Sequence, residues 1–224
     1  MHPLGTQAGE LAVSLDVRRL GGRGGPAPGG QDPPRKYPGT VLSLRPMTEA
    51  DLPAVETWLG RPHIARWWSD VSAEAETAKY RERVRPGATP AVHMLTAELD
   101  AVPIGWCQWY RWADHPDDAS AVGARDEEVG IDYAIGDPAR VGRGVGTTLI
   151  AALVAEVRRH HPGAGLLADP DAANIASRRV LEKNGFRLVA VRPVATEPTG
   201  APMAVYRLNP DEVNRDEVLG AVPA

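Results

Sequence analysis

Cysteine is almost absent from this 224-residue sequence, which contains Cys107 alone. A single cysteine excludes an intrachain disulfide and a multi-cysteine metal site, and no metal is predicted. No run reaches the roughly 18 apolar residues that a membrane-spanning helix needs, so no membrane partner is expected. The N-terminus lacks a basic segment followed by an apolar run, so no secretory signal is expected and the predicted location is cytoplasmic.

Positive charge is also in short supply. The 25 Lys and Arg residues are outnumbered by 29 Asp and Glu residues, which gives a net charge of −4. A nucleic-acid-binding domain usually carries a basic excess, so no nucleic-acid partner is predicted. The acidic balance is compatible with a cationic substrate, although it also serves solubility. Whether the chain is a monomer or a homodimer cannot be read from composition.

Aliphatic side chains are nearly missing from the segment GGRGGPAPGGQDPPRKYP, residues 21–38. Such a Gly- and Pro-rich composition cannot offset the entropy lost on ordering. Residues 1–40 are therefore predicted to be a disordered N-terminal extension, residues 41–210 one folded domain, and residues 211–224 a C-terminal tail.

Strand-like and helix-like patterns alternate irregularly within residues 41–210. A capping-box-like pair, Thr48 and Asp51, predicts a helix that continues to Leu59. Residues 113–126 read as a polar loop with several carboxylates. The order predicts an α+β fold in which helices cover a sheet. The expected strands are 41–45, 92–99, 102–110, 129–135, 166–168, 186–192 and 203–208, and the other expected helices are 73–83, 147–161 and 173–184.

A glycine-rich segment, RVGRGVGT, lies between a predicted strand and a long predicted helix. Its glycines permit positive φ and a close backbone approach, and the helix N-terminus favours an anion. A plain turn is the alternative reading. No lysine follows as a Walker loop requires, and the segment is too late in the chain for a Rossmann fingerprint. The predicted pyrophosphate-binding residues are Arg140, Val141, Gly142, Arg143, Gly144, Val145, Gly146 and Thr147.

A second motif follows about 20 residues after that helix begins. Together with the glycine loop, DPDAANIASRRVLEKNGF (169–186) resembles the GNAT superfamily of N-acetyltransferases. The resemblance implies the GNAT fold, with a mixed, mostly antiparallel central sheet flanked by helices, and acetyl-CoA as co-substrate. It also implies further contacts with acetyl-CoA from Asn174 and from the backbone of Tyr133, Ala134 and Ile135.

Two further segments point to a narrower group within this superfamily: MTEADLPAVETWLGRPHIARWW (47–68) and GIDYAIG (130–136). They look like the corresponding segments of aminoglycoside 6′-N-acetyltransferases, which implies a primary amine of a cationic small molecule as acceptor. The match places Asp132 at the family's active-site acid, so Asp132 is the predicted base. Strand interiors disfavour Asp, which supports a functional role for it.

Five further side chains are predicted to contact the acceptor. Tryptophan in a cleft can meet a sugar ring or an ammonium group, and carboxylates can pair with further ammonium groups, although Asp169 is equally suited to capping the next helix. These residues are Trp67, Trp68, Trp109, Asp169 and Glu197. A polycationic acceptor would also be attracted by the acidic residues of 113–128.

One position departs from the family pattern. Relatives usually carry Tyr seven residues after the Asn, as an acid for the departing thiolate, whereas this chain has Leu181. Water, Tyr133 or Tyr110 could take that role, or the weakly basic thiolate needs no acid. Two alternatives to aminoglycoside acetylation therefore stay open. One is acetylation of a lysine or hydroxylysine side chain, as in siderophore biosynthesis, or of a protein amine, and the other is acyl-CoA binding without catalysis.

Overall fold

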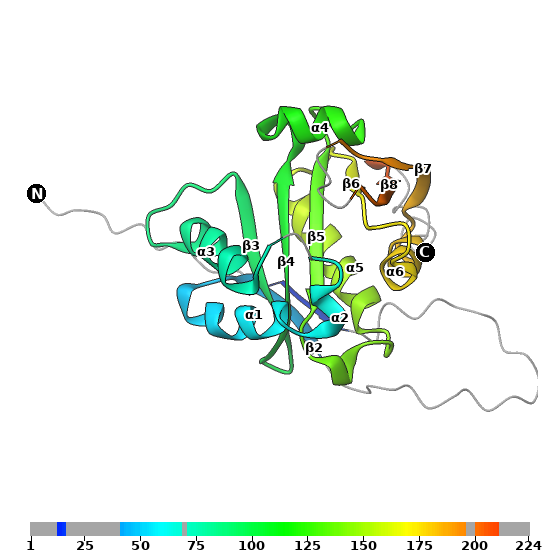
Figure 1. Cartoon of the computed structure of the whole chain (residues 1–224). Helices are drawn as coiled ribbons and strands as arrows, with labels where there is room; N and C mark the ends of the chain where they lie inside the picture. The colour runs from blue at the N-terminus through cyan, green and yellow to red at the C-terminus, as the bar shows by residue number, and fades with distance from the viewer. Residues whose placement is uncertain (1–12, 17–40, 69–70, 196–199, 211–224) are drawn as a thin grey trace, which may run out of the picture.

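The computed structural model describes residues 13–16, 41–68, 71–195 and 200–210 (Figure 1). In these residues eight strands form one sheet, in the order β1-β2-β3-β4-β5-β6-β8-β7. Neighbouring strands run antiparallel except for β5 and β6, which run parallel, so the predicted α+β fold with a mixed, mostly antiparallel sheet is confirmed. The strands are β1 (Val13–Asp16), β2 (Val41–Pro46), β3 (Val92–Leu99), β4 (Val102–Arg111), β5 (Val129–Ile135), β6 (Leu166–Ala168), β7 (Arg187–Pro193) and β8 (Pro202–Leu208).

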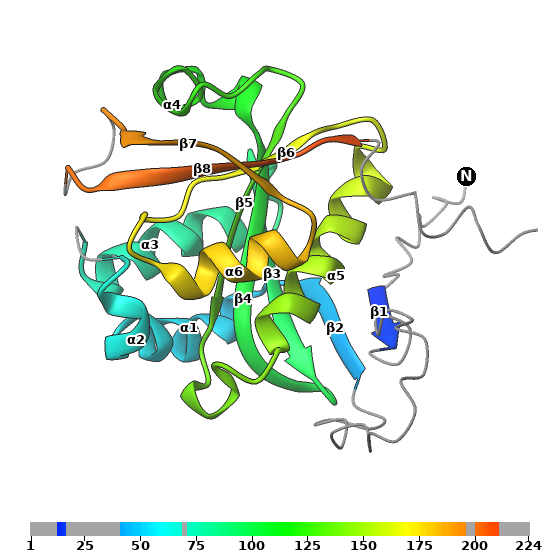
Figure 2. The ribbon, with the colours of Figure 1, turned by 90° about the vertical axis from the view of Figure 1, so that its right-hand side faces the viewer.

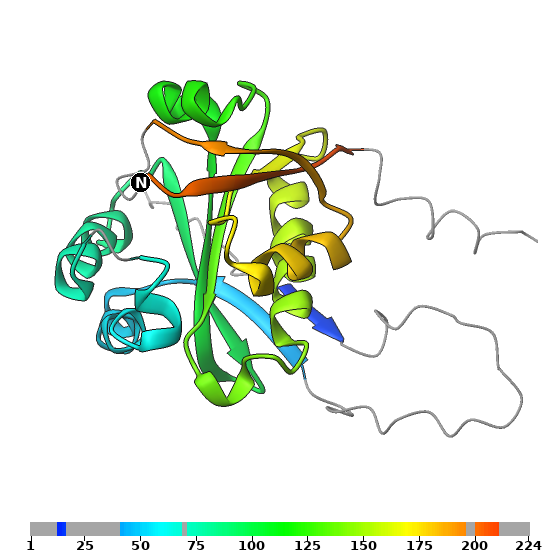
Figure 3. The same ribbon diagram turned by 45° about the vertical axis from the view of Figure 1, so that its right-hand side comes forward.

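Helices cover both faces of this sheet (Figure 3). One face packs against α1 (Leu52–Leu59), α2 (Pro62–Ala65) and α3 (Ala73–Val84), and the other against α5 (Val145–His160) and α6 (Ile175–Lys183). Short 3-10 turns occupy Glu49–Asp51, Trp112–Asp114 and Pro138–Arg140. None of the helices in the described ranges is long and apolar enough to cross a membrane.

Side-chain alternation along the strands separates two cores. On β4, Trp106 is fully buried among α1 to α3, whereas Trp109 is buried on the α5 face. On β5, Ala134 faces α1 to α3, whereas Ile131 and Tyr133 pack on the α5 and α6 side. Odd and even positions of one strand therefore serve different layers, as the period of 2 requires.

The parallel contact between β5 and β6 is short. Within the described residues it joins Val129 to Leu166 and Gly130 to Leu167, while β4 stays paired with β5 as far as Ile135. Trp112 N donates to Glu128 O, which marks residues 112 and 128 as a hydrogen-bonded pair. Such pairs recur at every second residue of an antiparallel ladder, so the peptide groups of residues 130, 132 and 134 also point toward β4. The peptide groups of Tyr133 and Ile135 consequently point into the opening between β5 and β6.

Two sequence-based predictions need correction. The predicted loop 113–126 contains a helix, α4 (Pro116–Val122), which begins with Pro116 and has Gly123 in the left-handed conformation as its C-cap. Both are ordinary helix signals that the run of carboxylates obscured. Within the predicted disordered extension 1–40, Val13–Asp16 forms β1 and pairs with β2; the rest of that extension and the tail 211–224 lie outside the described residues.

Gly136 closes β5 against the face of Trp58. A Cβ at this position would lie 2.2 Å from Trp58 Cδ2, too close for any unbonded contact. We expect Gly136→Ala to lower the free energy of unfolding by about 1–3 kcal/mol, because overpacking forces the ring or the strand to move. Chemical denaturation measures this loss. Gly163→Ala is the control, since no atom lies within 4 Å of its added Cβ; equal stability of the two variants would contradict the prediction.

Candidate active site

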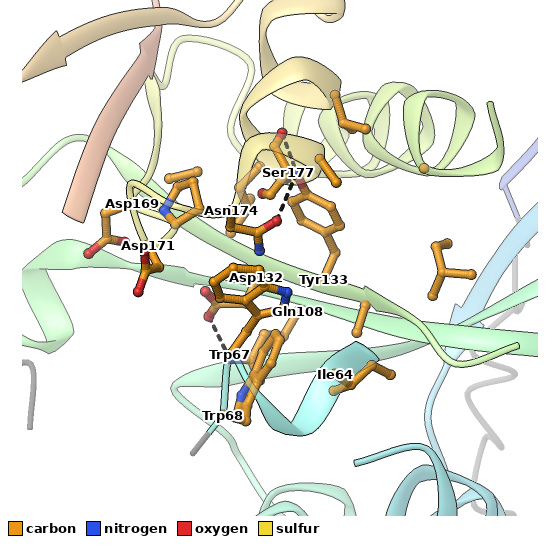
Figure 4. Close-up of a pocket in the computed structure, with 18 of the residues that line it drawn as sticks. Ile64, Trp67, Trp68, Gln108, Asp132, Tyr133, Asp169, Asp171, Asn174 and Ser177 are labelled. Carbon is orange, nitrogen blue, oxygen red and sulfur yellow. Dashed lines mark hydrogen bonds between the residues drawn. The ribbon is translucent and has the colours of Figure 1, made fainter. Parts of the chain in front are cut away.

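A cavity of about 780 Å³ lies where β5 and β6 separate (Figure 4). Asp132 and Gln108 line it from the face that carries α1 to α3, with Trp67 and Trp68 beside them. Tyr133 lines it from the opposite face, together with the glycine loop and the start of α6. The cavity therefore passes through the sheet, and the two alternating faces of β5 meet in it.

Asp132 is held by a chain of hydrogen bonds that crosses two strands and a helix. Gln108 lies directly opposite Asp132 in the β4–β5 register, and its Nε2 donates to Asp132 Oδ2 at 2.7 Å. Arg83 of α3 in turn donates from Nη1 to Gln108 Oε1 at 3.1 Å. Because Arg83 has donors but no acceptor, it fixes which end of the Gln108 amide faces the carboxylate. One carboxylate orientation is therefore selected.

The environment of Asp132 favours its neutral form. Loss of hydration raises the pKa of Asp132 above the ordinary value, and the negative charge of Glu76 adds to the rise. The hydrogen bond from Gln108 and the charge of Arg83 lower the pKa of Asp132, but they offset the rise only in part. A carboxylate with a raised pKa is a stronger base than a surface aspartate.

The wall of the cavity near Asp132 combines aromatic rings with carboxylates. Trp67 and Trp68 both line the cavity, and Trp68 also packs on Trp106 with ring centroids 5.8 Å apart. Asp169 lines it at the end of β6, and Asp171 lies beside it (Figure 4). Rings and carboxylates suit ammonium groups. The cavity is also lined by Arg66, Lys79 and Arg83, and Arg66 Cζ lies 4.9 Å from the centroid of the Trp67 ring.

Trp109 was predicted to contact the acceptor, and this is wrong. Trp109 follows Gln108 directly on β4, and successive side chains of a strand point to opposite faces of the sheet. The Trp109 ring therefore lies on the α5 face. There it stacks on His93 with ring centroids 3.8 Å apart and is 4% exposed. Among the acidic residues of 113–128, Asp118 lines the cavity, whereas Glu128 is buried and pairs with Arg207. Glu197 lies outside the described residues.

The glycine loop lines the other end of the cavity. Gly142 and Gly144 have φ of 72° and 86°, values that favour glycine, and Gly144 is the N-cap of α5. A Cβ at either glycine would point into open space, so a ligand can approach the backbone. The side chains of Arg143 and Val145 are not in the cavity lining: Arg143 is exposed and Val145 is in the core. The loop residues in the lining are Arg140, Val141, Gly142, Gly144, Gly146 and Thr147.

The start of α6 completes the site beside β5. Asn174 Oδ1 accepts from Ser177 N and caps α6. The hydroxyl groups of Tyr133 and Ser177 lie 2.7 Å apart (Figure 4). Burial raises the pKa of Tyr133, so its hydroxyl stays protonated and able to donate. Leu181 is fully buried and supplies no proton donor.

The sequence argument missed several polar residues of the site, among them Arg83, Gln108 and Ser177. Arg83 and Gln108 reach the site through pairing or packing between elements and carry no local motif, whereas Ser177 lies within the 169–186 motif without having been singled out. The strand register that places Gln108 opposite Asp132 was the available signal, given that 102–110 and 129–135 were both predicted strands. No group of three or more His, Cys, Asp or Glu side chains in the described ranges is arranged to hold a metal ion.

Comparison with known proteins gives consistent matches. A family model described as an acetyltransferase (GNAT) domain matches residues 47–192. The chain is 33% identical over 172 residues to aminoglycoside N(6′)-acetyltransferase type 1 of Klebsiella pneumoniae, covering 74% of this chain and 81% of that protein. It is 26% identical over 185 residues to the lysine N-acyltransferase MbtK of Mycolicibacterium paratuberculosis, covering 82% of this chain and 80% of that one.

Solved structures of aminoglycoside acetyltransferases are also similar to this chain. Aminoglycoside acetyltransferase AAC(6′)-Ib in complex with coenzyme A superposes with a TM-score of 0.59 at 28% identity, covering 75% of this chain and 94% of that chain. The same acetyltransferase in complex with coenzyme A and kanamycin also gives a TM-score of 0.59, at 29% identity and the same coverage.

The raised pKa of Asp132 has a consequence for stability. A carboxylate whose pKa is higher in the folded than in the unfolded protein lowers the free energy of unfolding when it is ionised. This loss is absent below the unfolded pKa, about 3.9, and is greatest above the folded pKa. Asp132→Asn should therefore raise Tm at pH 7.5, with a gain that shrinks as the pH falls toward 4. Thermal melts across this range measure it. The exposed Asp126→Asn serves as control and should leave Tm unchanged; a Tm loss for Asp132→Asn at pH 7.5 would refute the assignment of a desolvated carboxylate.

Proposed function

We propose, since the chain belongs to the GNAT acetyltransferase family, that it transfers an acetyl group from acetyl-CoA to the 6′-amino group of an aminoglycoside. The observation that carries the proposal is a cavity that crosses the sheet at β5, with Asp132 on one side and the glycine loop on the other. The similarity to aminoglycoside N(6′)-acetyltransferase type 1 supports the choice of acceptor.

The glycine loop fits the pyrophosphate of acetyl-CoA. Its glycines leave open space over the backbone, and the positive end of the α5 dipole lies at Gly144. In the first turn of α5, Thr147 N and Thr148 N donate to Gly144 O, whereas the N–H groups of Val145 and Gly146 lie too early in the helix for an intrahelical acceptor and can serve as donors. The thioester arm would then extend along β5, where the peptide groups of Tyr133 and Ile135 point into the opening.

The acceptor must lose a proton before it attacks, because an alkyl ammonium has an ordinary pKa of about 10.4 and no lone pair. Asp132 holds the ammonium and accepts its proton, directly or through a water molecule. The nitrogen lone pair forms a C–N bond to the thioester carbonyl carbon, while the carbonyl oxygen takes the negative charge. As the intermediate collapses, the nitrogen loses its second proton, and the C–S bond breaks. The electron pair of that bond leaves with sulfur, which is protonated to the thiol.

Other residues support these steps. Backbone N–H groups of Tyr133 and Ile135 are positioned to donate to the carbonyl oxygen as it becomes negative. Gln108 and Arg83 act as positioning residues, because they hold Asp132 in one orientation. Tyr133 is the candidate donor to the leaving sulfur, since it combines a protonated hydroxyl with a place on β5 beside α6.

The first test concerns the co-substrate. Gly144→Asp introduces a negative charge into the proposed pyrophosphate cradle and forces a side chain at positive φ. We expect calorimetry to give at least a tenfold loss of acetyl-CoA affinity, about 1.4 kcal/mol. Gly87→Asp is a matched control, because Gly87 also has positive φ, at 78°, with no atom within 4 Å of its added Cβ. Equal acetyl-CoA affinity in the two folded variants would refute the cradle.

The second test concerns acceptor and base together. Kanamycin carries a 6′-amino group, whereas paromomycin carries a 6′-hydroxyl that has no ammonium for Asp132 to hold. We expect thiol release with kanamycin and none with paromomycin. Asp132→Asn should lower kcat/KM for kanamycin by about 10²-fold or more while acetyl-CoA affinity is retained.

The same assay separates the alternatives. Free lysine and a lysine-containing peptide are included because of the similarity to the lysine N-acyltransferase MbtK. Turnover of lysine with none of kanamycin would replace the proposed acceptor. Binding of acetyl-CoA without turnover of any amine would instead indicate a non-catalytic module.

A further inference from the structure

A basic face of α6 borders the glycine-loop end of the cavity. Arg179 and Lys183 are four residues apart, so they lie on the same face of the helix, and both line the cavity. Val180 lies between them and packs on the loop: a Cβ at Gly146 would be 3.3 Å from Val180 Cγ2. Val180 therefore connects the part of α6 that carries the two cations to the proposed pyrophosphate cradle.

Neighbouring contacts keep this face charged and close to the loop. Glu182, the acid adjacent to Lys183, is engaged elsewhere and accepts from Tyr206 OH at 2.6 Å. At the C-terminal end of α6, Asn184 Nδ2 donates to Thr147 O in the first turn of α5. Figure 2 shows α6 lying against α5. The helix is thus fixed to the loop while its basic side chains remain exposed to the cavity.

The polar residues at the start of α6 differ in kind from those toward its end. Asn174 and Ser177 lie at its start, beside Tyr133 and the proposed thioester position. Arg179 and Lys183 follow toward its end, so the helix extends over roughly 13 Å from the reacting end to the basic end. In coenzyme A the thioester arm is followed by the pyrophosphate and then by adenosine with a 3′-phosphate. The basic end of α6 corresponds to the last of these groups.

We propose that Arg179 and Lys183 form a subsite for the 3′-phosphate of coenzyme A, which makes the chain select coenzyme A over its 3′-dephospho form. The proposal rests on the proposed function, because it extends the same co-substrate site. A phosphate monoester carries a charge of about −1.5 to −2 at neutral pH. Arg can bind it through two parallel N–H groups, and Lys adds a compact charge.

Calorimetry with coenzyme A and 3′-dephospho-coenzyme A tests this, because the two compounds differ by that phosphate alone. The unsubstituted full chain should bind coenzyme A at least tenfold more tightly. The double variant Arg179→Gln/Lys183→Gln should lose this preference, with its affinity for the dephospho compound unchanged within twofold. Arg179→Lys, which keeps the charge but not the paired N–H groups, should retain part of the preference.

A charge-matched control removes long-range effects. Arg81→Gln/Arg85→Gln deletes two cations on the far side of the molecule, on and just after α3, and should leave both affinities unchanged. An equal loss for both compounds in the Arg179/Lys183 variant would assign these side chains to the pyrophosphate and overturn the proposal. Coenzyme A bound without preference by the unsubstituted chain would overturn it alone, whereas no binding of either compound would overturn the proposed function as well.

Discussion

The site depends on the point at which β5 and β6 stop pairing. β6 ends at Ala168, and Asp169 and Pro170 follow at once. The chain stays beside β8 over the next residues, where Ala204 N donates to Pro170 O and Asp171 bridges Met203, but it no longer pairs with β5. β5 continues alone on that side as far as Ile135, and its peptide groups are left without strand partners. Ile135 O accepts from His63 Nε2 at 2.9 Å, and a bound amide- and thioester-containing arm can supply partners for other peptide groups of this stretch.

The opening has chemically different sides because β5 alternates its side chains. Asp132 belongs to the layer of α1 to α3, beside Trp67 and Trp68, whereas Tyr133 belongs to the layer of α5 and α6, beside the glycine loop. One strand therefore separates a region suited to ammonium groups from a region suited to phosphates. Asp132 and Tyr133, which face the two regions, are a single residue step of about 3.3 Å apart along β5.

Most elements of this fold could be predicted from the sequence, because their signals are local. The long helix α5 and the strands β3, β4 and β5 follow from hydrophobic spacing, and the glycine loop follows from its composition. α4 was missed because carboxylates masked the signals at Pro116 and Gly123. The paired β1 was missed because nothing in residues 13–16 outweighs the Gly- and Pro-rich segment that follows.

The site could be predicted only in part, and for a related reason. Asp132 and the loop carry their own motif, but Trp109 was assigned to the wrong face because the alternation along β4 was not applied to its tryptophans. Gln108 and Arg83 act on Asp132 through strand register and helix packing, and those relations connect residues 24 and 25 positions apart. Such contacts follow from the fold and not from any local pattern.

The division of β5 into two faces also bears on how such a chain can evolve. A substitution in α2, in α3 or at an even position of β5 alters the acceptor region and leaves the side chains of the opposite layer in place. The phosphate region is thereby insulated from changes in acceptor preference. Relatives named for aminoglycosides and for lysine differ in acceptor, as this insulation allows. Because neighbouring side chains of one strand face opposite layers, a change of acceptor does not require a change in the side chains that face the glycine loop.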